Sequence, residues 1–285
     1  MIILESNVPN PNICLPAFPQ ANLYWALNEA APEIPGTAMP MICHNDYEIY
    51  IHVFGDISLS SDGRLYLLSP GDIAILPPYT IHRLINPRMQ TVRYYSLRIP
   101  ETFSKDYFSP LYNQPHSRYL SPNISEANRL KSLCSALDTL AHPVAPSAAK
   151  RISSVFELIA LIEDIQASGH FLSPSPLSRE LTDVVNFLEA SYAQPLTLSE
   201  IASRAGMSSQ ALAKIFHSEL DTTPISYLQE LRLRKARDLL STTLPLNDVC
   251  KLCGFSDYSR FIERFRKAYG ITPHKLQQLF SDRTR

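Results

Sequence analysis

The hydrophobic positions follow two different periods along the chain. Between about residues 40 and 100, short runs rich in Ile, Val, Tyr and Leu are separated by turn signals about every 8–12 residues. This spacing predicts the short strands of a β-sandwich or small barrel. The pair Asp62-Gly63 predicts a hairpin turn between two of these strands. From about Asn123 onward the apolar residues recur three and four positions apart, which predicts helices. The pattern therefore predicts an α+β chain, with strands first and helices after.

The strand predicted at residues 44–54 has two faces of different chemistry. Side chains alternate along a strand, so one face carries only aliphatic groups: Ile49, Ile51 and Val53. The other face combines acid, imidazole and aromatic groups: Glu48, Tyr50, His52 and Phe54. Such a lining suits a polyhydroxylated ligand such as a sugar, held by stacking and hydrogen bonds. Tyr50 and His52 fit equally well as ordinary interior residues of a barrel.

Two apolar stripes at helical spacing lie between residues 121 and 178. One stripe runs from Leu130 to Leu140 and the second from Ile152 to Ile162. A helical pair packed on its own β-domain and a dimer interface both need such stripes, and the pattern does not separate them. We carry forward the prediction of a dimer that forms through residues 130–165. Ser168–Ser178, with two Pro and four Ser, is predicted to be a linker.

An internal repeat lies in the last hundred residues. The segment Ile201–Ser208 matches Val249–Ser256, 48 residues later. In each copy a helix with small and apolar residues on one face is followed by a Gly that can end it and a Ser that can cap the next helix. Two short helices that cross closely in this way form a helix-turn-helix, whose second helix enters the major groove of DNA. Between the copies, residues 226–241 predict a helix with four basic residues between Arg232 and Arg237.

Composition narrows the class of protein. The hydrophobic share of 45% and the charged share of 19% are typical of globular chains. The sequence has no apolar run of the roughly 20 residues that a membrane span needs, and it does not begin with a secretory signal pattern. Five scattered Cys favour a reducing cytoplasm. The net charge of −1 divides into −4 for residues 1–178 and +3 for residues 179–285, which permits nucleic-acid binding by the C-terminal part.

A consistent series of residues runs through both repeat copies and the helix between them. The series is Leu198, Ile201, Ala202, Gly206, Met207, Ser208, Arg232, Leu233, Ala236, Leu239, Leu240, Gly254, Phe255, Ser256, Asp257, Phe261, Phe265, Arg266, Lys267, Gly270, Thr272 and Pro273. With these residues, the segment 180–280 resembles the tandem helix-turn-helix domain of the AraC/XylS family of transcription regulators. The resemblance implies a regulator that reads two successive major grooves.

The same resemblance implies which residues face the DNA. In the first reading helix the groove-facing positions are Ser209, Gln210, Ala213 and Lys214, and in the second they are Tyr258, Ser259, Arg260 and Glu263. Gln can pair with adenine and Lys with guanine, whereas Arg232 is expected to contact phosphates. Three positions depart from the family pattern. Arg260 replaces a usual aromatic residue, Glu263 a frequent basic residue, and Asp221 a usual Gly that Gly270 retains in the second copy.

Residues 44–86 resemble the cupin pattern. Glu48-x6-Gly55 matches the end of its first motif, and Gly71-x5-Pro77-x-Tyr79-x2-His82-x3-Asn86 its second, with Tyr79 in place of a Gly. In metal-binding cupins this resemblance implies a metal held by His44, Glu48, His82 and a further His, but Ile42 occupies that further position. We therefore expect no metal and no cofactor. Sensor domains of the regulator family resemble cupins and bind organic effectors, so the expected effector-binding residues are His44, Glu48, Tyr50, His52 and His82.

Together these patterns predict three parts. Residues 1–120 form a cupin-like β-barrel that senses an effector, 121–178 a helical dimerisation segment and linker, and 179–285 an all-α tandem helix-turn-helix domain. The expected partners are promoter DNA, a small-molecule effector such as a sugar or other polar metabolite, RNA polymerase and a second copy of the chain. The predicted protein is a cytoplasmic regulator and not an enzyme.

Two other classes compete with this interpretation. A metal-dependent cupin enzyme with an appended DNA-binding domain is the main alternative, and the missing first His argues against it. A DNA-repair alkyl acceptor would need an activated Cys in a zinc-ligated N-terminal module, and the Cys spacing there offers none. Cys250 and Cys253 also invite a zinc interpretation. They match Ala202 and Ala205 of the first copy, however, so core packing is the better prediction.

Overall fold

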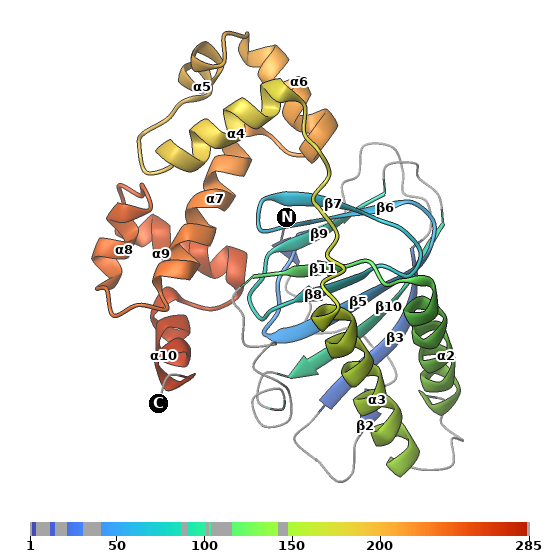
Figure 1. Cartoon of the computed structure of the whole chain (residues 1–285). Helices are drawn as coiled ribbons and strands as arrows, with labels where there is room; N and C mark the ends of the chain where they lie inside the picture. Colours follow the sequence, from blue (N-terminus) through green and yellow to red (C-terminus); the bar gives the residue numbers. More distant parts are fainter. Residues whose placement is uncertain are drawn as a thin grey trace.

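The structure, a computed structural model, describes residues 2–3, 12–14, 22–30, 41–86, 91–100, 103, 116–141 and 148–283. Strands occupy the N-terminal part and helices the C-terminal part (Figure 1). Between them in the sequence lie α2 (Ile124–Ala141) and α3 (Ala148–Ala167), which lie against the strands in space. The chain is therefore α+β: a β-unit with two attached helices, followed by a helical unit.

The strands of the described residues form two sheets. The six-stranded sheet has the order β11-β8-β5-β10-β3-β2, and the five-stranded sheet the order β1-β4-β9-β6-β7. The bounds are β1 Ile2–Ile3, β2 Asn12–Cys14, β3 Asn22–Ala30, β4 Met41–Ile42, β5 Asp46–Phe54, β6 Ile57–Ser61, β7 Arg64–Leu68, β8 Ile73–Leu76, β9 His82–Ile85, β10 Val92–Pro100 and β11 Arg118–Leu120. Neighbouring strands pair antiparallel, except that β1 and β4 are parallel. This arrangement shows two sheets and does not show the closed barrel that we expect from the sequence.

Strand β5 separates two cores, as its alternation predicts. Ile49 and Ile51 pack in one cluster with residues of α2 and α3. Tyr50 packs on the opposite side, in a cluster with residues of both sheets such as Leu59 on β6 and Leu76 on β8. The acidic and aromatic face of β5 is therefore the one that looks into the space between the sheets.

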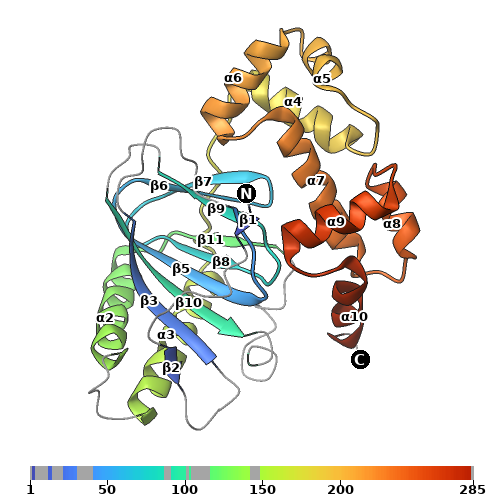
Figure 2. The ribbon, with the colours of Figure 1, turned by 180° about the vertical axis from the view of Figure 1, so that it is seen from behind.

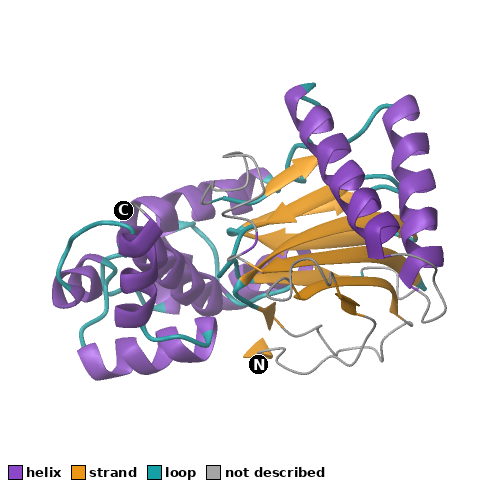
Figure 3. Ribbon diagram, turned by 90° about the horizontal axis from the view of Figure 1, so that it is seen from below, coloured by secondary structure: helices purple, strands orange, loops and turns teal. Residues whose placement is uncertain are grey.

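The apolar stripes of α2 and α3 are buried within the chain itself. Leu137 and Ile159 are 0% and 3% exposed and share a core with Ile49. Figure 3 shows both helices lying over the sheet. The stripes therefore need no second chain to be buried, and a dimer through residues 130–165 stays a prediction. Their apolar side chains cover the chain's own sheet, which is the other interpretation that the periodicity allows.

The helical unit begins after the segment 168–178, which connects α3 to α4. This connection lies along β7, where Ser175 donates its N–H to Leu65 O and accepts one from Leu67 through its hydroxyl. The helices that follow are α4 Arg179–Ser191, α5 Leu198–Arg204, α6 Ser209–Leu220, α7 Pro224–Leu239, α8 Leu246–Leu252, α9 Tyr258–Tyr269 and α10 Pro273–Arg283. In the described part of the chain, no helix is long and apolar enough to cross a membrane.

The two repeat copies fold as helix, turn and helix. Thr197 and Glu200 form a capping box at the start of α5, and the Ser208 side chain accepts the Ala211 N–H at the start of α6. Gly206 and Gly254 end the first helix of each copy with φ of 67° and 76°. Long α7 joins the copies, so each second helix, α6 or α9, is held at a fixed place relative to the other.

Candidate functional site

The N-terminal ends of α6 and α9 present the residues that were expected to read DNA. Among the described side chains, Gln210 and Lys214 on α6 are exposed and Ser209 is half-buried. On α9 the whole expected set is exposed: Tyr258, Ser259, Arg260 and Glu263. Helix N-termini carry partial positive charge and unpaired N–H groups, which favours a polyanion. These two helix ends are therefore candidate nucleic-acid contacts.

Arg232 does not lie where a phosphate contact requires. Its side chain is 7% exposed and crosses to the loop after α4. There Nε donates to Tyr192 O at 2.7 Å and Nη2 donates to Gln194 O at 2.6 Å. A guanidinium held by two carbonyls of the chain has a structural role, so the expectation that Arg232 contacts DNA is corrected.

The rest of the basic run on α7 is also engaged inside the chain. Arg234 and Lys235 lie 2.7 Å and 3.0 Å from the carboxylate of Glu189 on α4. Arg237 is buried and lies 3.4 Å from Asp62 and 3.0 Å from Asp238. The run therefore binds α7 to its neighbours and is neither a solvated face nor a phosphate-binding face.

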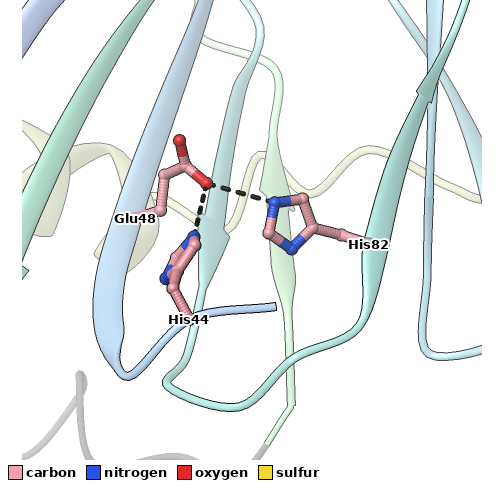
Figure 4. A group of neighbouring side chains, drawn as sticks. All are labelled: His44, Glu48 and His82. Carbon is pink, nitrogen blue, oxygen red and sulfur yellow. Dashed lines mark hydrogen bonds and ion pairs between the residues drawn. The ribbon is translucent and has the colours of Figure 1, made fainter. Parts of the chain in front are cut away.

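A second candidate site lies in the β-unit, where His44, Glu48 and His82 meet (Figure 4). Glu48 Oε2 is 3.0 Å from His44 Nε2 and 3.2 Å from His82 Nε2. Glu48 comes from β5 and His82 from the start of β9, so the site bridges the two sheets. All three side chains are at most 6% exposed. The sequence-predicted residues of the cupin pattern are thus brought together.

The Glu48 carboxylate is held in its charged form. Its second oxygen, Oε1, accepts a hydrogen bond from Ser96 and lies 3.6 Å from Arg98 Nε. Burial alone would raise the pKa of Glu48. The hydrogen bonds from His44 and His82 and the charge of Arg98 outweigh burial, so this pKa lies well below its ordinary value.

A small cavity adjoins the cluster. It measures about 80 Å³ and is lined by Glu48, Tyr50 and His82 together with Ile42, Tyr94, Ser96, Arg98 and neighbouring residues. Pockets for drug-sized ligands measure about 300–1,000 Å³, so a whole sugar does not fit without movement of the sheets. The Tyr50 hydroxyl has no hydrogen-bond partner among the described residues, although its side chain is 2% exposed. His52 does not line this cavity; its Nε2 lies 2.7 Å from Gly55 O.

Sequence reasoning missed part of the cavity wall. Tyr94, Ser96 and Arg98 alternate along β10, and β10 pairs with β5 so that Arg98 lies opposite Glu48. Alternation within the predicted strand at 92–99 was a usable signal for this face. No comparable signal identifies Arg98 as the residue opposite Glu48 before the pairing of the strands is known.

The two units meet at a set of polar contacts that we call the joint: Asp62 and Arg83 of the β-unit with Arg237, Asp221 and Leu220 O of the helical unit. Asp62 sits at the turn between β6 and β7, and Arg83 on β9 donates to Leu220 O at 3.0 Å and lies 3.5 Å from Asp221. Asp221 adopts φ of 47°, which explains why Gly is usual at this position. Here the acidic residue also supplies a charge to the joint.

An apolar contact accompanies the joint. Cys43, Tyr79 and Ile81 of the β-unit belong to one buried cluster with Leu233 of α7 and Phe265 of α9. Figure 2 shows α7 and α9 beside the ends of the strands. Tyr79 has φ of 62°, so the position where the cupin pattern has Gly keeps the Gly conformation. The side chain gained there is buried at the contact between the units.

A cleft of about 620 Å³ opens next to this contact. Met41 and Ile81 line it from the β-unit, and Arg260, Glu263 and other residues of α7 and α9 line it from the helical unit. Arg260 and Glu263, two of the residues expected to read DNA, thus line a cleft whose other wall belongs to the β-unit. The cleft links the candidate nucleic-acid contact on α9 to the β-unit.

Comparison with known families assigns both units. The family described as "AraC-like ligand binding domain" matches residues 31–159, and the family described as "Helix-turn-helix domain" matches residues 201–279. The chain belongs to the AraC/XylS family of transcription regulators. This AraC-family chain matches both the ligand-binding domain and the helix-turn-helix domain of the family. The ligand-binding domain comes first in the sequence, as the resemblance implies.

Several relatives are similar to this AraC-family chain. The HTH-type transcriptional regulator ArgR of Pseudomonas aeruginosa is 36% identical over 97 residues, which cover 34% of this chain and 30% of ArgR. The transcriptional activator NphR of a Rhodococcus species is 29% identical, with 80% of this chain and 68% of NphR covered. A solved AraC-type DNA-binding protein from Chromobacterium violaceum is 34% identical, with 35% of this chain and 91% of that chain covered and a TM-score of 0.34. The chain thus spans less than a third of the length of ArgR.

Proposed function

We propose that this chain is an effector-responsive regulator that binds promoter DNA with α6 and α9 in two successive major grooves. The observation that carries the proposal is the pair of exposed helix ends, with Lys214 on α6 and Arg260 on α9, on either side of α7. Helix α7 has 16 residues and is therefore about 24 Å long. With its flanking turns, it suits two reading helices about one DNA turn, roughly 34 Å, apart.

The proposed parts are those expected from the sequence: a sensor in residues 1–120, a helical segment and linker in 121–178, and the DNA-binding part in 179–285. The proposed effector site is the cavity at Glu48, Tyr50 and His82, with His44 as a contact of Glu48. The cavity volume favours an effector smaller than a sugar. His52 makes its contact at Gly55, away from the lining residues, so its expected role is the weakest of the five.

The effector signal can reach the DNA-binding part through the segment Tyr79–His82. At one end His82 lines the cavity. At the other, Tyr79 donates its N–H to His44 O at 2.8 Å and accepts a hydrogen bond from Arg237 at 3.3 Å through its own carbonyl. Ile81, between them, lines the cleft beside α9. A ligand that shifts His44 or His82 would therefore move groups that touch α7 and α9.

The remaining partners follow from this role. We propose that the chain works in the cytoplasm on promoters, influences RNA polymerase there, pairs as a homodimer and catalyses no reaction. The pairing surface is expected outside the buried stripes of α2 and α3, since Leu137 and Ile159 are already buried in the chain's own core.

The test is DNA binding by the full chain and by residues 179–285, measured by fluorescence anisotropy on promoter fragments and on random DNA. We expect a clear preference for certain promoter fragments and a steep salt dependence. Lys214→Ala should relax base preference at one position by about 1–3 kcal/mol, because a bidentate contact to guanine is lost. Ser218→Ala, an exposed change on the same helix, is the matched control. Equal affinity for promoter and random DNA in both proteins would refute the proposal.

A further inference from the structure

The cleft between the β-unit and the helices α7 and α9 measures about 620 Å³. This volume lies within the range of about 300–1,000 Å³ that small-molecule sites occupy, whereas the cavity at Glu48, which we call the sensor cavity, measures about 80 Å³. We propose that the cleft binds a small organic anion with an apolar body, such as an aryl carboxylate or sulfonate. This site is additional to the proposed effector cavity, and only its effect on DNA binding rests on the proposed function.

The floor of the cleft is apolar. Ile81 of the β-unit, Leu233 of α7 and Ala268 of α9 line it and are 6%, 8% and 2% exposed. Met41 of β4 and Ile225 of α7 extend this surface as half-buried side chains. Apolar surface that a bound molecule removes from water stabilises the complex in proportion to its area. The floor therefore selects a ligand with an aromatic or hydrocarbon body over a simple inorganic ion.

Cations form the rim of the cleft. Arg260, Arg264 and Lys267 are spaced four and three residues apart on α9, so they lie on one face of this helix, and all three line the cleft. All three side chains are exposed. Arg260 Nε lies 3.7 Å from a carboxylate oxygen of Asp257, whereas neither Arg264 nor Lys267 has a carboxylate partner among the described residues. A rim of this charge beside an apolar floor is complementary to an amphipathic anion.

Two carboxyl groups also line the cleft, and they do not cancel these cations. Glu230 on α7 is surrounded by protein, and burial raises its pKa above the ordinary value, although Arg234 and Arg83 lower it in part. Any charge on Glu230 is therefore balanced by two arginines outside the rim. Glu263 is exposed on α9 and opposes a bound anion. The three rim cations outnumber this single carboxylate, so the cleft is positive on balance.

Arg264 is already oriented for an anion. Its Nη1 donates to Oε1 of Gln229 on α7 at 2.7 Å, so the guanidinium is held between the two helices that line the cleft. A guanidinium has five N–H donors in a fixed plane, and the others remain for the oxygens of a carboxylate or sulfonate. A side chain that is fixed before the ligand arrives loses less conformational entropy on binding.

The cleft and the sensor cavity share no lining residue, but they lie on opposite sides of one backbone layer. Met41 lines the cleft and the next residue, Ile42, lines the sensor cavity. In the same way Ile81 lines the cleft and His82 the sensor cavity, and Ile42 pairs with His82 across β4 and β9. Successive side chains of an extended chain point to opposite faces, which explains this division. A molecule in either space therefore contacts residues adjacent in sequence to those that line the other.

An anion in the cleft would contact both units. Met41 and Ile81 would contact it from the β-unit, and Arg260 from α9, where this residue is expected to read DNA. The anion therefore favours the arrangement in which the units are in contact, and it covers part of the surface that α9 offers to DNA. Linkage then requires that the anion and promoter DNA weaken each other's binding by the same factor.

The test is a fluorescence titration of the full-length chain with two probes of similar shape. Anilinonaphthalene sulfonate carries an anionic group on an apolar body, and phenylnaphthylamine has that body without the sulfonate. We expect the sulfonate probe to bind at one saturable site per chain. Arg264→Gln combined with Lys267→Gln should weaken binding of the sulfonate probe about tenfold and leave binding of the neutral probe unchanged, because only the charged group contacts the rim.

Two further variants complete the titration. Arg266→Gln, an exposed change on α9 outside the cleft lining, is the matched control and should keep the affinity for the sulfonate probe. Glu263→Gln removes the opposing charge and should strengthen binding of the sulfonate probe about threefold, a gain that loss of folding cannot produce. The inference is overturned by a wild type without saturable binding, by unchanged affinity in the double variant or in Glu263→Gln, or by an equal loss in Arg266→Gln.

Promoter binding measured on the same samples separates this inference from the proposed function. The sulfonate probe should weaken promoter binding by the wild type and affect the double variant much less. An occupied cleft that leaves promoter affinity unchanged would overturn the competition with DNA. Promoter preference without a cleft site would defeat only the inference, and a cleft site without any promoter preference would defeat only the proposed function.

Discussion

Asp62, at the turn between β6 and β7, lies 3.4 Å from the guanidinium of Arg237 in the middle of the DNA-binding part. A hairpin of the β-unit thus reaches α7, the helix that connects the two helix-turn-helix copies. Asp62 also accepts hydrogen bonds from the N–H and hydroxyl of Ser117, so its carboxylate is fixed from the sensor side before it meets Arg237. The contact is a firm connection between two parts of the chain that are 175 residues apart.

The first prediction concerns the pH dependence of stability at this joint. Burial raises the pKa of Asp62. The charge of Arg237 and the hydrogen bonds from Ser117 together lower this pKa by more than burial raises it, so the net pKa lies below its ordinary value. A carboxylate with a depressed pKa stabilises the folded state above its unfolded pKa and loses that contribution as the pH falls through the folded pKa. Denaturant unfolding of the wild type between about pH 5 and pH 2 should therefore lose more free energy than unfolding of Asp62→Asn.

Glu230 on α7 supplies a control of opposite sign. Burial raises the pKa of Glu230 above its ordinary value, although Arg234 and Arg83 lower it in part. Such a group favours the folded state below its unfolded pKa and loses this contribution as the pH rises through the folded pKa. Glu230→Gln should therefore raise stability at neutral pH. Identical pH profiles for wild type and Asp62→Asn would contradict the role given to Asp62.

The second prediction separates two arginines that the sequence places in one class. Arg232→Ala should lower the free energy of unfolding by about 2 kcal/mol, because the carbonyls of Tyr192 and Gln194 lose a charged donor. Arg260 on α9 has a side chain that is 77% exposed, so Arg260→Ala should leave stability unchanged and weaken DNA binding. Thermal melts and DNA titrations of both variants decide the matter. An Arg232→Ala protein with normal stability and a reduced salt slope would restore the phosphate contact.

Local signals in the sequence predicted much of this fold. The hairpin at Asp62-Gly63 is present with both residues at positive φ, and the expected Ser208 cap and Gly206 helix end are in place. These features depend on residues close in sequence, and short-range chemistry determines them. Strands β3 and β11 were missed. Their hydrophobic runs are short or mixed, and their pairing with β10 and β8 is what makes them strands.

The candidate site was predictable only in part. The pattern of the cupin motif brought out Glu48 and His82, and the structure places them 3.2 Å apart. The structural role of Arg232 was missed, because the sequence alone does not show whether a basic side chain faces solvent or a buried carbonyl. The contact between Arg83 and Asp221 depends on how the β-unit and the helical unit meet, and no periodicity within either unit contains that information.

The third prediction uses the two glycines that occupy equivalent places in the repeat. Gly206 has no atom within 4 Å of the position where a Cβ would stand, so Gly206→Ala should cost only the positive φ, about 1–2 kcal/mol. At Gly254 an added Cβ would lie 2.7 Å from Ala193 O and 2.8 Å from Ala193 Cα. Gly254→Ala should therefore cost about 1–3 kcal/mol more than Gly206→Ala. Chemical denaturation of the two variants measures the difference, and equal losses would show that Ala193 does not pack against Gly254.

The last prediction concerns DNA affinity and the joint. Arg260 and Glu263 line the cleft that Met41 and Ile81 enter from the sensor. A B-DNA major groove is about 12 Å wide and is flanked by two phosphate backbones, so we predict that the β-unit beside this cleft hinders the approach of α9 to DNA. On this prediction, DNA binding by the full chain includes the free energy of opening the joint.

Weakening the joint should accordingly strengthen DNA binding. Arg83→Ala removes the contacts to Leu220 O and Asp221, and Asp62→Ala removes the contact to Arg237. If each contact contributes about 1.4 kcal/mol to the closed arrangement, each variant should bind a promoter fragment about tenfold more tightly than the wild type. Residues 179–285 alone should bind at least as tightly as either variant, because this segment has no sensor to release. Arg93→Ala, an exposed change on β10 where the Arg stacks on Phe54, is the control and should leave affinity unchanged. If Arg83→Ala and Asp62→Ala bind no more tightly than wild type while remaining folded, the sensor does not restrain α9, and the effector must act on DNA binding by another route.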